Sequence, residues 1–308
     1  MSGETRHNAI TSPGGNIVAV GMFDGLHTGH LHLLDSLKAK GAEHGLHPIV
    51  ITFSNHPLEI IAPEKAPRLL STTDEKSALF HATGMDARII PFDNTLRMTS
   101  ATDFMHMLSR RYGVREMLLG FNNRFGHDAP RDFDAYRRLA AECGITITRA
   151  TELTSGNGTH VSSSVIRDLI GNHGDIPTAT TLLGHPYELS GTITHGKQLG
   201  RTIGFPTANL IPSDNRKLIP KAGVYAATAT LQDGQKYPAV VNIGHRPTVD
   251  SPGSAISIEA HIIGFSGDLY GHTLTVQFRR RLRDERRFPT LAALRTQIAA
   301  DIQAAREV

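Results

Sequence analysis

Two histidines and several glycines lie close together in the segment GMFDGLHTGH at residues 21–30. Its glycines are Gly21, Gly25 and Gly29. Glycine lets a backbone turn tightly and approach a ligand, and a helix that follows such a turn offers free N–H groups to a phosphate. His27 and His30 are three residues apart, so both imidazoles can face that space and donate hydrogen bonds to phosphate oxygens. The segment predicts a phosphate site; the simpler alternative is an ordinary strand-to-helix turn that His27 caps.

A second polar cluster lies in VSSSVIRDLI at residues 161–170. Its serines are Ser162, Ser163 and Ser164. They can cap a helix, and Arg167 would then project about one turn further along it. Hydroxyls, free backbone N–H groups and a guanidinium together can clamp a phosphate. Taken alone, the segment fits a serine cap followed by a solvent-facing arginine better than a phosphate site, but its pairing with residues 21–30 favours phosphate chemistry.

The third cluster is GTITHGKQLGRTIGFPTANL at residues 191–210. Its glycines Gly191, Gly196, Gly200 and Gly204 predict a loop that approaches phosphates. Pro206 fixes the chain before Thr207 and Asn209, which face the same side of an extended segment. A hydroxyl and an amide oxygen are suitable ligands for Mg²⁺ alongside ATP oxygens. The alternative is a glycine-rich hairpin with a polar turn.

Alternating strand and helix patterns must position the first two clusters. The strand candidates are residues 16–22, 48–53, 86–92, 115–121 and 144–150. Helix patterns cover residues 30–40, 100–112 and 132–143, and another begins at Ser71. This order predicts an α/β domain with a mostly parallel sheet, helices on both faces and ligands at the carboxyl ends of the strands.

The later part of the chain reads as strands separated by turn residues. The candidates are residues 187–194, 224–231, 237–244, 256–265 and 272–280. Their spacing predicts an antiparallel barrel or sandwich. A last helix follows Pro289, and Leu291, Leu294, Ile298 and Ile302 are expected to form its core-facing seam. We expect a tail at 1–15, a first domain at 16–180 and a second at 181–308.

The amino-acid composition indicates which class of protein the chain belongs to. The chain has 308 residues, a net charge of +3 and 39% hydrophobic residues, as expected for a soluble globular protein of about two domains. Its single cysteine, Cys143, excludes a disulfide framework and a Cys-rich zinc site. No apolar run approaches the roughly 18 residues of a membrane span, and the first residues have no signal-peptide pattern. We therefore expect a cytoplasmic protein with no membrane partner.

A nucleic-acid role is disfavoured. The basic segment RRRLRDERR at 279–287 contains an acidic pair and follows a strand, so we interpret it as a solvated charged face. Absence of tryptophan and only 6% aromatic residues argue against a platform for stacking bases. The sequence leaves the oligomeric state open.

The HxGH turn and the SSxIR-type segment resemble the nucleotidylyltransferase superfamily. The form FDGxHxGH, together with Thr52, Phe53, His56 and Pro57, resembles the FMN adenylyltransferase half of bacterial FAD synthetases, as does LLGFNNRFGHD at 118–128. The resemblance implies a Rossmann-like fold in which His27, His30 and Arg167 are catalytic. The nucleotide- and flavin-binding residues that it implies are Gly21, Phe23, Asp24, Gly25, Gly29, His56, Asn122, Ser162, Ser163 and Ser164.

Residues 183–308 resemble riboflavin kinases. The motif GxPTAN at 204–209 is followed in family order by GVYA, NIGHRPT, IEAHI and GDLYG. The resemblance implies that Thr207 and Asn209 hold Mg²⁺ with ATP, and that Glu259 is the catalytic base. The further binding residues that it implies are Gly191, Gly196, Gly200, Gly204, Pro206, Thr207, Asn209 and Arg246. From the residues alone, Glu259 fits equally an exposed strand position between apolar Ile258 and Ala260.

Together the motifs resemble the bifunctional bacterial riboflavin kinase/FMN adenylyltransferase family. That resemblance implies two ATP-dependent reactions, from riboflavin to FMN and from FMN to FAD, with flavins as substrate and product. Asn55, Asn122 and Asn123 depart from the residues common in this family. One alternative is therefore a monofunctional kinase with a degenerate adenylyltransferase domain; another is a non-enzymatic flavin-binding protein.

Overall fold

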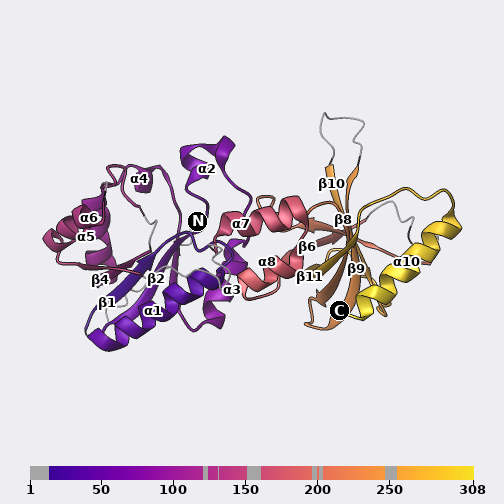
Figure 1. Ribbon diagram of the computed structural model, residues 1–308, viewed down its shortest axis with the longest axis horizontal. Helices are drawn as coiled ribbons and strands as arrows, with labels where there is room; N and C mark the ends of the chain where they lie inside the picture. Colours follow the sequence, from indigo (N-terminus) through magenta and orange to yellow (C-terminus); the bar gives the residue numbers. More distant parts are fainter. Residues whose placement is uncertain are drawn as a thin grey trace. The chain divides into compact units, whose positions relative to one another are not determined.

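The chain divides into two compact units between Val161 and Ser162 (Figure 1). The computed structural model describes residues 14–120, 124–130, 132–150, 161–195, 200, 204–246 and 255–308, with the backbone alone for 245, 246 and 255. The domain boundary at residues 180/181 stays a prediction.

The first unit is built on a parallel sheet of five strands in the order β3-β2-β1-β4-β5. The strands are β1 (Asn16–Val20), β2 (His47–Phe53), β3 (Asp86–Ile90), β4 (Val114–Leu119) and β5 (Thr146–Arg149). All five residues of β1 are buried, as expected for a central strand covered on both faces. Its carboxyl end therefore lies in the middle of the sheet edge, where ligands bind in such folds.

Helices cover both faces of this sheet. The longer ones are α1 (Thr28–His44), α3 (Thr73–Ala82), α5 (Ala101–Tyr112) and α6 (Phe133–Glu142). One core cluster joins the sheet to Leu34, Leu37 and Phe80, and the other joins it to Phe104 and Tyr136. The predicted Rossmann-like α/β architecture is confirmed. The short helices α2 (Leu58–Ile61), η1 (Pro63–Lys65) and α4 (Asn94–Arg97) were not predicted, because three or four residues show no helical period.

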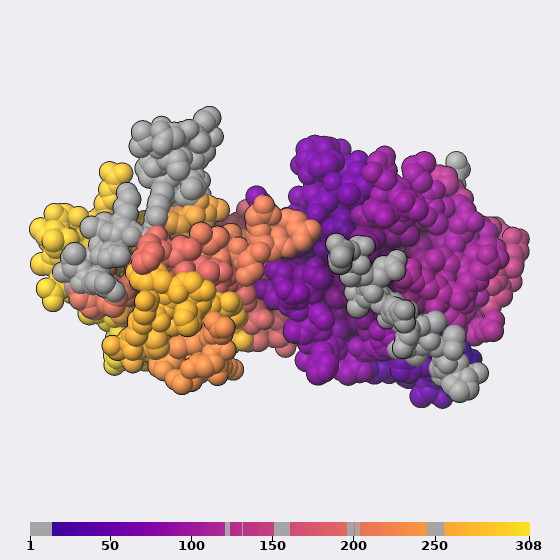
Figure 2. Space-filling model, turned by 180° about the vertical axis from the view of Figure 1, so that it is seen from behind, coloured from indigo at the N-terminus to yellow at the C-terminus, as the bar shows by residue number. Residues whose placement is uncertain are grey.

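The second unit contains a closed barrel in the order β10-β7-β6-β11-β8-β9. The strands are β6 (Glu188–Thr194), β7 (Ala208–Pro212), β8 (Gly223–Leu231), β9 (Lys236–Arg246), β10 (Ala255–Ile262) and β11 (Thr273–Arg283). The antiparallel barrel is confirmed and the sandwich alternative is not. Sequence patterns missed β7 because it follows a glycine-rich stretch. Figure 2 shows one face of this unit, to which early (salmon), middle (orange) and late (yellow) parts of its sequence all contribute.

The helical segments in the described residues of the second unit are α7 (Ser163–Asp168), the π-helical turn η2 (Leu169–His173), α8 (Ile176–Leu183) and α10 (Leu291–Arg306). Ile302 and Ala305 of α10 pack with Val224 and Val240 of the barrel, which confirms a core-facing helix. The predicted seam is wrong at Leu291, which is 66% exposed, because the apolar contacts of α10 come from its carboxyl-terminal half.

The basic segment at 279–287 also helps to hold this helix. The guanidinium of Arg283 donates to both carboxylate oxygens of the buried Asp301, from Nε at 3.1 Å and from Nη2 at 2.8 Å. The interpretation as a solvated face is therefore wrong for Arg283, whose side chain is 19% exposed. Within the described residues, no helix combines the length and the apolar character needed to cross a membrane.

Candidate active sites

The first site begins where β1 ends. Residues 21–27 form the turn that leads into α1, and two non-glycine residues in it, Phe23 and Leu26, have φ angles of +47° and +35°. L-residues rarely adopt this region, and such strain is concentrated at functional sites. Gly25 has a φ of +77°, which glycine adopts without cost.

His27 and His30 lie against each other at the start of α1. His27 is the N-cap of the helix, and its Nδ1 accepts a hydrogen bond from the His30 backbone N–H at 3.3 Å. Their rings are stacked with centroids 3.6 Å apart and planes 14° apart. A Cβ at Gly29 would lie 3.2 Å from His27 Nδ1, so glycine leaves room for this ring. The His27 cap of the simpler alternative is present, and the two histidines predicted to be catalytic lie together.

The protonation of His30 is set by its surroundings. Burial, followed by His27 and Lys76, lowers the pKa of His30 well below its usual value of 6.5. The ring is therefore neutral at pH 7, with one nitrogen that donates and one that accepts. Among the described residues, its buried Nδ1 has no hydrogen-bond partner.

Asp24 and Phe23 help to hold the turn itself. The buried Asp24 carboxylate accepts hydrogen bonds from the backbone N–H groups of Leu70 and Ser71, the shortest at 2.9 Å. Phe23 is 2% exposed and packs edge-on against Phe80 of α3 with centroids 5.6 Å apart. The predicted ligand contacts of Asp24, Phe23 and Gly21 stay predictions.

A cavity of about 900 Å³ opens beside this turn. Its lining includes the predicted Gly21 and His56, the aromatic rings of Phe53, Phe92 and Phe125, and Arg97 and Arg124. Flat apolar walls with a few cationic groups suit a planar ring that carries phosphate.

Sequence patterns did not single out Phe92, which lines this cavity and contacts Asn55, one of the departures from the family pattern. The Asn55 amide donates to the Phe92 carbonyl and accepts from the Phe92 N–H, both at 2.9 Å. Phe92 in turn packs edge-on against Phe53 with centroids 5.5 Å apart. Asn55 therefore fixes one wall of the cavity.

The serine cluster caps α7 in the second unit. The Ser162 hydroxyl accepts from the Val165 N–H at 3.4 Å, which confirms a serine N-cap. Ser163, Ser164 and Arg167 belong to the same short helix. Their predicted meeting with the histidines stays a prediction, and Asn122 lies outside the described residues.

The second site lies on neighbouring strands of the barrel. The Thr207 hydroxyl donates to Glu259 Oε2 at 3.4 Å. Asn209 of β7 stands directly opposite Glu259 of β10 in the strand register. Ile258 and Ala260 are buried in the core, so Glu259 faces the outer side of the barrel, where it is half-buried. The structure thus brings the three predicted kinase residues together.

Asn242 extends this polar row and was missed as a site residue. It stands opposite Glu259 on β9, the other neighbour of β10, and its amide donates to Glu285 Oε1 at 3.2 Å. The signal was its place in the NIGHRPT motif.

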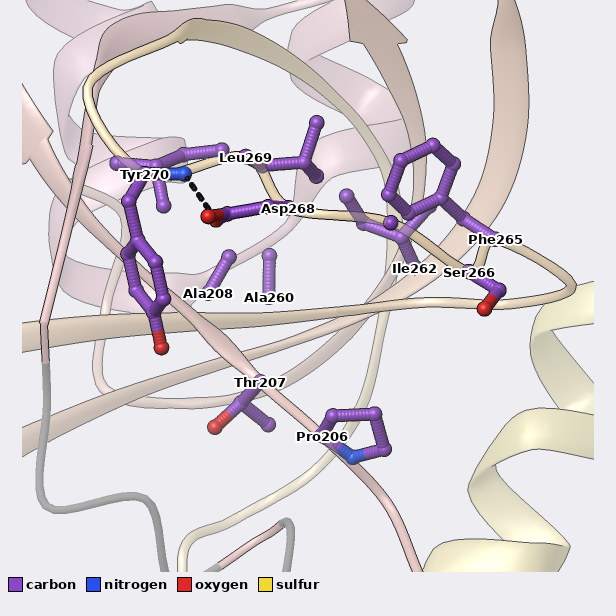
Figure 3. A pocket seen from close by; sticks show the side chains of 12 residues that line it. Pro206, Thr207, Ala208, Ala260, Ile262, Phe265, Ser266, Asp268, Leu269 and Tyr270 are labelled. Atoms are coloured by element: carbon purple, nitrogen blue, oxygen red, sulfur yellow. Dashed lines mark hydrogen bonds between the residues drawn. The ribbon is translucent and has the colours of Figure 1, made fainter.

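A cavity of about 250 Å³ lies next to Thr207 (Figure 3). Pro206 and Thr207 line it from the strand side, and Asp268 and Tyr270 line it from the loop between β10 and β11. The Tyr270 ring extends toward Thr207, which directly precedes β7, and its centroid lies 3.7 Å from that of the His195 ring. Sequence patterns placed this loop in the GDLYG motif without assigning its side chains.

The glycines near this site have different structural roles. Gly204 has a φ of +85°, which favours glycine. A Cβ at Gly200 would lie 2.2 Å from the Phe205 carbonyl oxygen, and one at Gly191 would lie 2.2 Å from the Ile211 carbonyl oxygen. Gly191 therefore permits close strand packing, and its predicted ligand contact stays a prediction. Gly196 and the Arg246 side chain lie outside the described residues.

The donor set at Thr207 fits Mg²⁺ chemically. A hydroxyl and a carboxylate lie within hydrogen-bond distance, and an amide side chain stands on the facing strand. Mg²⁺ prefers such oxygen donors and commonly takes its remaining ligands from nucleotide phosphates and water.

Comparisons with known proteins cover nearly the whole chain. Residues 9–165 match the FAD synthetase family, and residues 183–308 match the riboflavin kinase family. The bifunctional riboflavin kinase/FMN adenylyltransferase of Pseudomonas fluorescens is 37% identical over 302 residues, covering 97% of this chain and 95% of that protein. The enzyme of the same name from Escherichia coli K12 is 36% identical, covering 98% and 95%, and that from Bacillus subtilis is 31% identical, covering 94% and 91%.

A solved structure supports the same fold over the full length. It is named as a macrolide-efflux protein from Streptococcus pneumoniae, is 28% identical and has a TM-score of 0.84. The alignment covers 96% of this chain and 95% of that one. The name describes that protein, whereas the relatives at 31–37% identity agree with both family matches. This chain belongs to the bifunctional riboflavin kinase/FMN adenylyltransferase family.

Proposed function

We propose that this chain phosphorylates riboflavin to FMN and then adenylylates FMN to FAD, with the kinase chemistry in the barrel and the adenylyl transfer at the parallel sheet. One observation supports the proposed residue roles: Asn209 and Glu259 stand opposite each other on neighbouring strands, and Thr207, just before β7, donates to Glu259. These are the types of group that an ATP-dependent transfer to an alcohol requires.

In the kinase reaction, Glu259 accepts the proton of the riboflavin 5′-hydroxyl. A primary alcohol is a poor nucleophile at neutral pH, so a carboxylate at this position assists the attack of its oxygen on the γ-phosphorus of ATP. The bond from the γ-phosphorus to the bridging oxygen breaks, and ADP leaves. Thr207 and Asn209 would hold Mg²⁺, which, when bound, neutralises charge on the phosphates.

Adenylyl transfer requires no strong base, because the attacking group is an FMN phosphate oxygen that is already anionic. It attacks the α-phosphorus of a second ATP, and the bond to the bridging oxygen breaks to release pyrophosphate. His27, His30 and Arg167 donate hydrogen bonds to the α-phosphate and the leaving pyrophosphate. Neutral His30 suits this role because it still carries one N–H.

The remaining binding residues surround the two sites. Gly21, Gly25, Gly29 and His56 are proposed to contact nucleotide or flavin near the first site, with the serines at the start of α7. Gly200, Gly204 and Pro206 are proposed to do so near the second. Riboflavin, FMN and ATP are the partners of this chemistry, which we place in the cytoplasm, where ATP is abundant.

Two substitutions separate the reactions. His30→Ala is expected to lower FAD formation from FMN and ATP by about 10²–10³-fold while FMN formation persists, because one donor to the developing charge is lost. His32→Ala on the same helix is the matched control and should leave both rates unchanged. Equal loss of both activities in His30→Ala would contradict the assignment.

Glu259→Gln is expected to have the opposite effect. Loss of the base should slow FMN formation by about 10²–10⁴-fold, whereas FAD formation from supplied FMN continues. Glu188→Gln, in the same barrel, is the control. An unchanged rate of FMN formation would remove Glu259 from the base role.

A further inference from the structure

Lys76 is a buried lysine behind the adenylyl-transfer site. It lies in α3 and is 1% exposed. Its Nζ donates hydrogen bonds to the carbonyl oxygens of Met22 at 2.9 Å and Phe53 at 2.8 Å. Lysine is almost never buried this completely unless its ammonium is well bound. Lys76 therefore joins the carboxyl ends of two neighbouring parallel strands, β1 and β2.

The Met22 carbonyl belongs to the strained turn that presents the histidines. The next residue, Phe23, has a φ of +47°. The same carbonyl also accepts from the Thr52 hydroxyl at 2.9 Å. Phe80 lies one turn after Lys76 on α3 and packs against the Phe23 ring. Helix α3 thus holds this turn at two adjacent points, one polar and one apolar.

The ammonium also acts on His30 through its charge. Lys76 lowers the pKa of His30, after the larger effects of burial and of His27. Among the described residues, the titratable groups that act on His30 are His27 of the turn itself and Lys76 of α3, and Asp24 lies in the same turn. Asp24 is held by backbone N–H groups of the segment that leads into α3.

We propose that Lys76 is a positioning residue for adenylyl transfer, which fixes the strained turn at residues 21–27 so that His27 and His30 meet the nucleotide in a productive geometry. This inference rests on the proposed function of the first unit. Lys76 acts through the two carbonyl groups and not on the nucleotide, because its Nζ is engaged beneath the turn.

The test compares Lys76→Met with Lys38→Met. Lys38 offers a matched control because its Nζ also donates to a backbone carbonyl, that of Thr83 at 2.8 Å, just beyond the far end of α3. In Lys76→Met, kcat for FAD formation from FMN should fall about 10–100-fold with little change in KM for ATP, as expected for misplaced catalytic groups. Lys38→Met should keep the wild-type rate, and both variants should form FMN from riboflavin normally.

An NMR titration measures the pKa of His30, which would not change in this way if Lys76 only stabilised the fold. The pKa of His30 should rise in Lys76→Met, because a positive neighbour is lost, and stay unchanged in Lys38→Met. Lys76→Gln keeps one donor without the charge, so it should give an intermediate rate with a raised His30 pKa. This second variant tests the proposal even where Lys76→Met fails to fold.

The positioning role would be overturned if folded Lys76→Met or Lys76→Gln kept the wild-type kcat and an unchanged His30 pKa. The proposed function of the first unit would survive that result, because the wild-type protein would still form FAD. A wild-type protein that forms no FAD would overturn the proposed function as well. Loss of FMN formation together with FAD formation in Lys76→Gln would also contradict the inference, because the barrel should be unaffected.

Discussion

The neutral state of His30 follows from where its side chain lies. A histidine in the unfolded chain titrates near pH 6.5, whereas burial, followed by the effects of His27 and Lys76, keeps the folded-state pKa of His30 well below that value. Between the two pKa values, the unfolded chain binds a proton that the folded unit does not. Protonation therefore favours unfolding, and the stability of the first unit falls as the pH drops below 6.5.

The pH dependence can be measured with His30→Asn. The first unit of wild-type protein should lose more thermal stability between pH 7 and pH 5.5 than that of His30→Asn, because the variant lacks this titrating ring. Thermal unfolding monitored by NMR signals of the first unit checks the difference, with His32→Asn as the control. The same loss in wild type and His30→Asn would show that the His30 ring is not held neutral.

Thr207 carries a prediction at the other site. Thr207→Ala removes a proposed Mg²⁺ ligand and the hydroxyl that contacts Glu259. The Mg²⁺ concentration needed for half-maximal FMN formation should rise by about 10–100-fold, the loss typical of groups around metal sites. Thr275→Ala is the control, since the Thr275 hydroxyl pairs with that of Ser190 instead. An unchanged Mg²⁺ requirement would exclude Thr207 as a ligand.

At the scale of elements, strands and helices follow sequence patterns where burial is continuous. The apolar run at residues 16–22 predicted β1 because a central parallel strand is buried on both faces. Strand β7 was missed because a glycine-rich stretch precedes it and its five residues show no clean alternation. The contact of Thr207 with Glu259 could not be predicted from spacing either, because it depends on the pairing of β7 with β10 across about fifty residues.

Contacts between residues far apart in sequence also determine which residues support a site without lining it. Lys76 appears in the sequence only as part of a helix-opening pattern, and its role depends on two carbonyls that are 54 and 23 residues away. Leu291 shows the converse error: it has the right spacing for the seam of α10 but lies at the helix start, away from the packed half. The spacing of apolar residues identifies one face of a helix or strand, but it does not show which part of that face is covered by other elements.

Gly191 gives a prediction for the barrel. A Cβ there would lie 2.2 Å from a carbonyl oxygen of β7, so Gly191→Ala must push two paired strands apart. Overpacking of this kind costs about 1–3 kcal/mol, and the melting temperature of the second unit should fall. Thr192→Ala, on the exposed side of the same strand, is the control. Full retention of stability in Gly191→Ala would show that the strands can separate without cost.

At the scale of the whole molecule, each compact unit has its own core and carries residues of a candidate site. The parallel sheet carries the turn with the two histidines, and the barrel carries the threonine, asparagine and glutamate. The matches to two families follow the same order along the chain. The product of the barrel chemistry is the substrate of the other unit, so FMN should appear before FAD.

One time course tests this account most directly. Purified protein is incubated with riboflavin, excess ATP and Mg²⁺, and riboflavin, FMN and FAD are separated by chromatography at successive times. The account predicts that FMN appears first and is then converted to FAD. FMN that accumulates without FAD, or riboflavin that stays unchanged with folded protein, would contradict it.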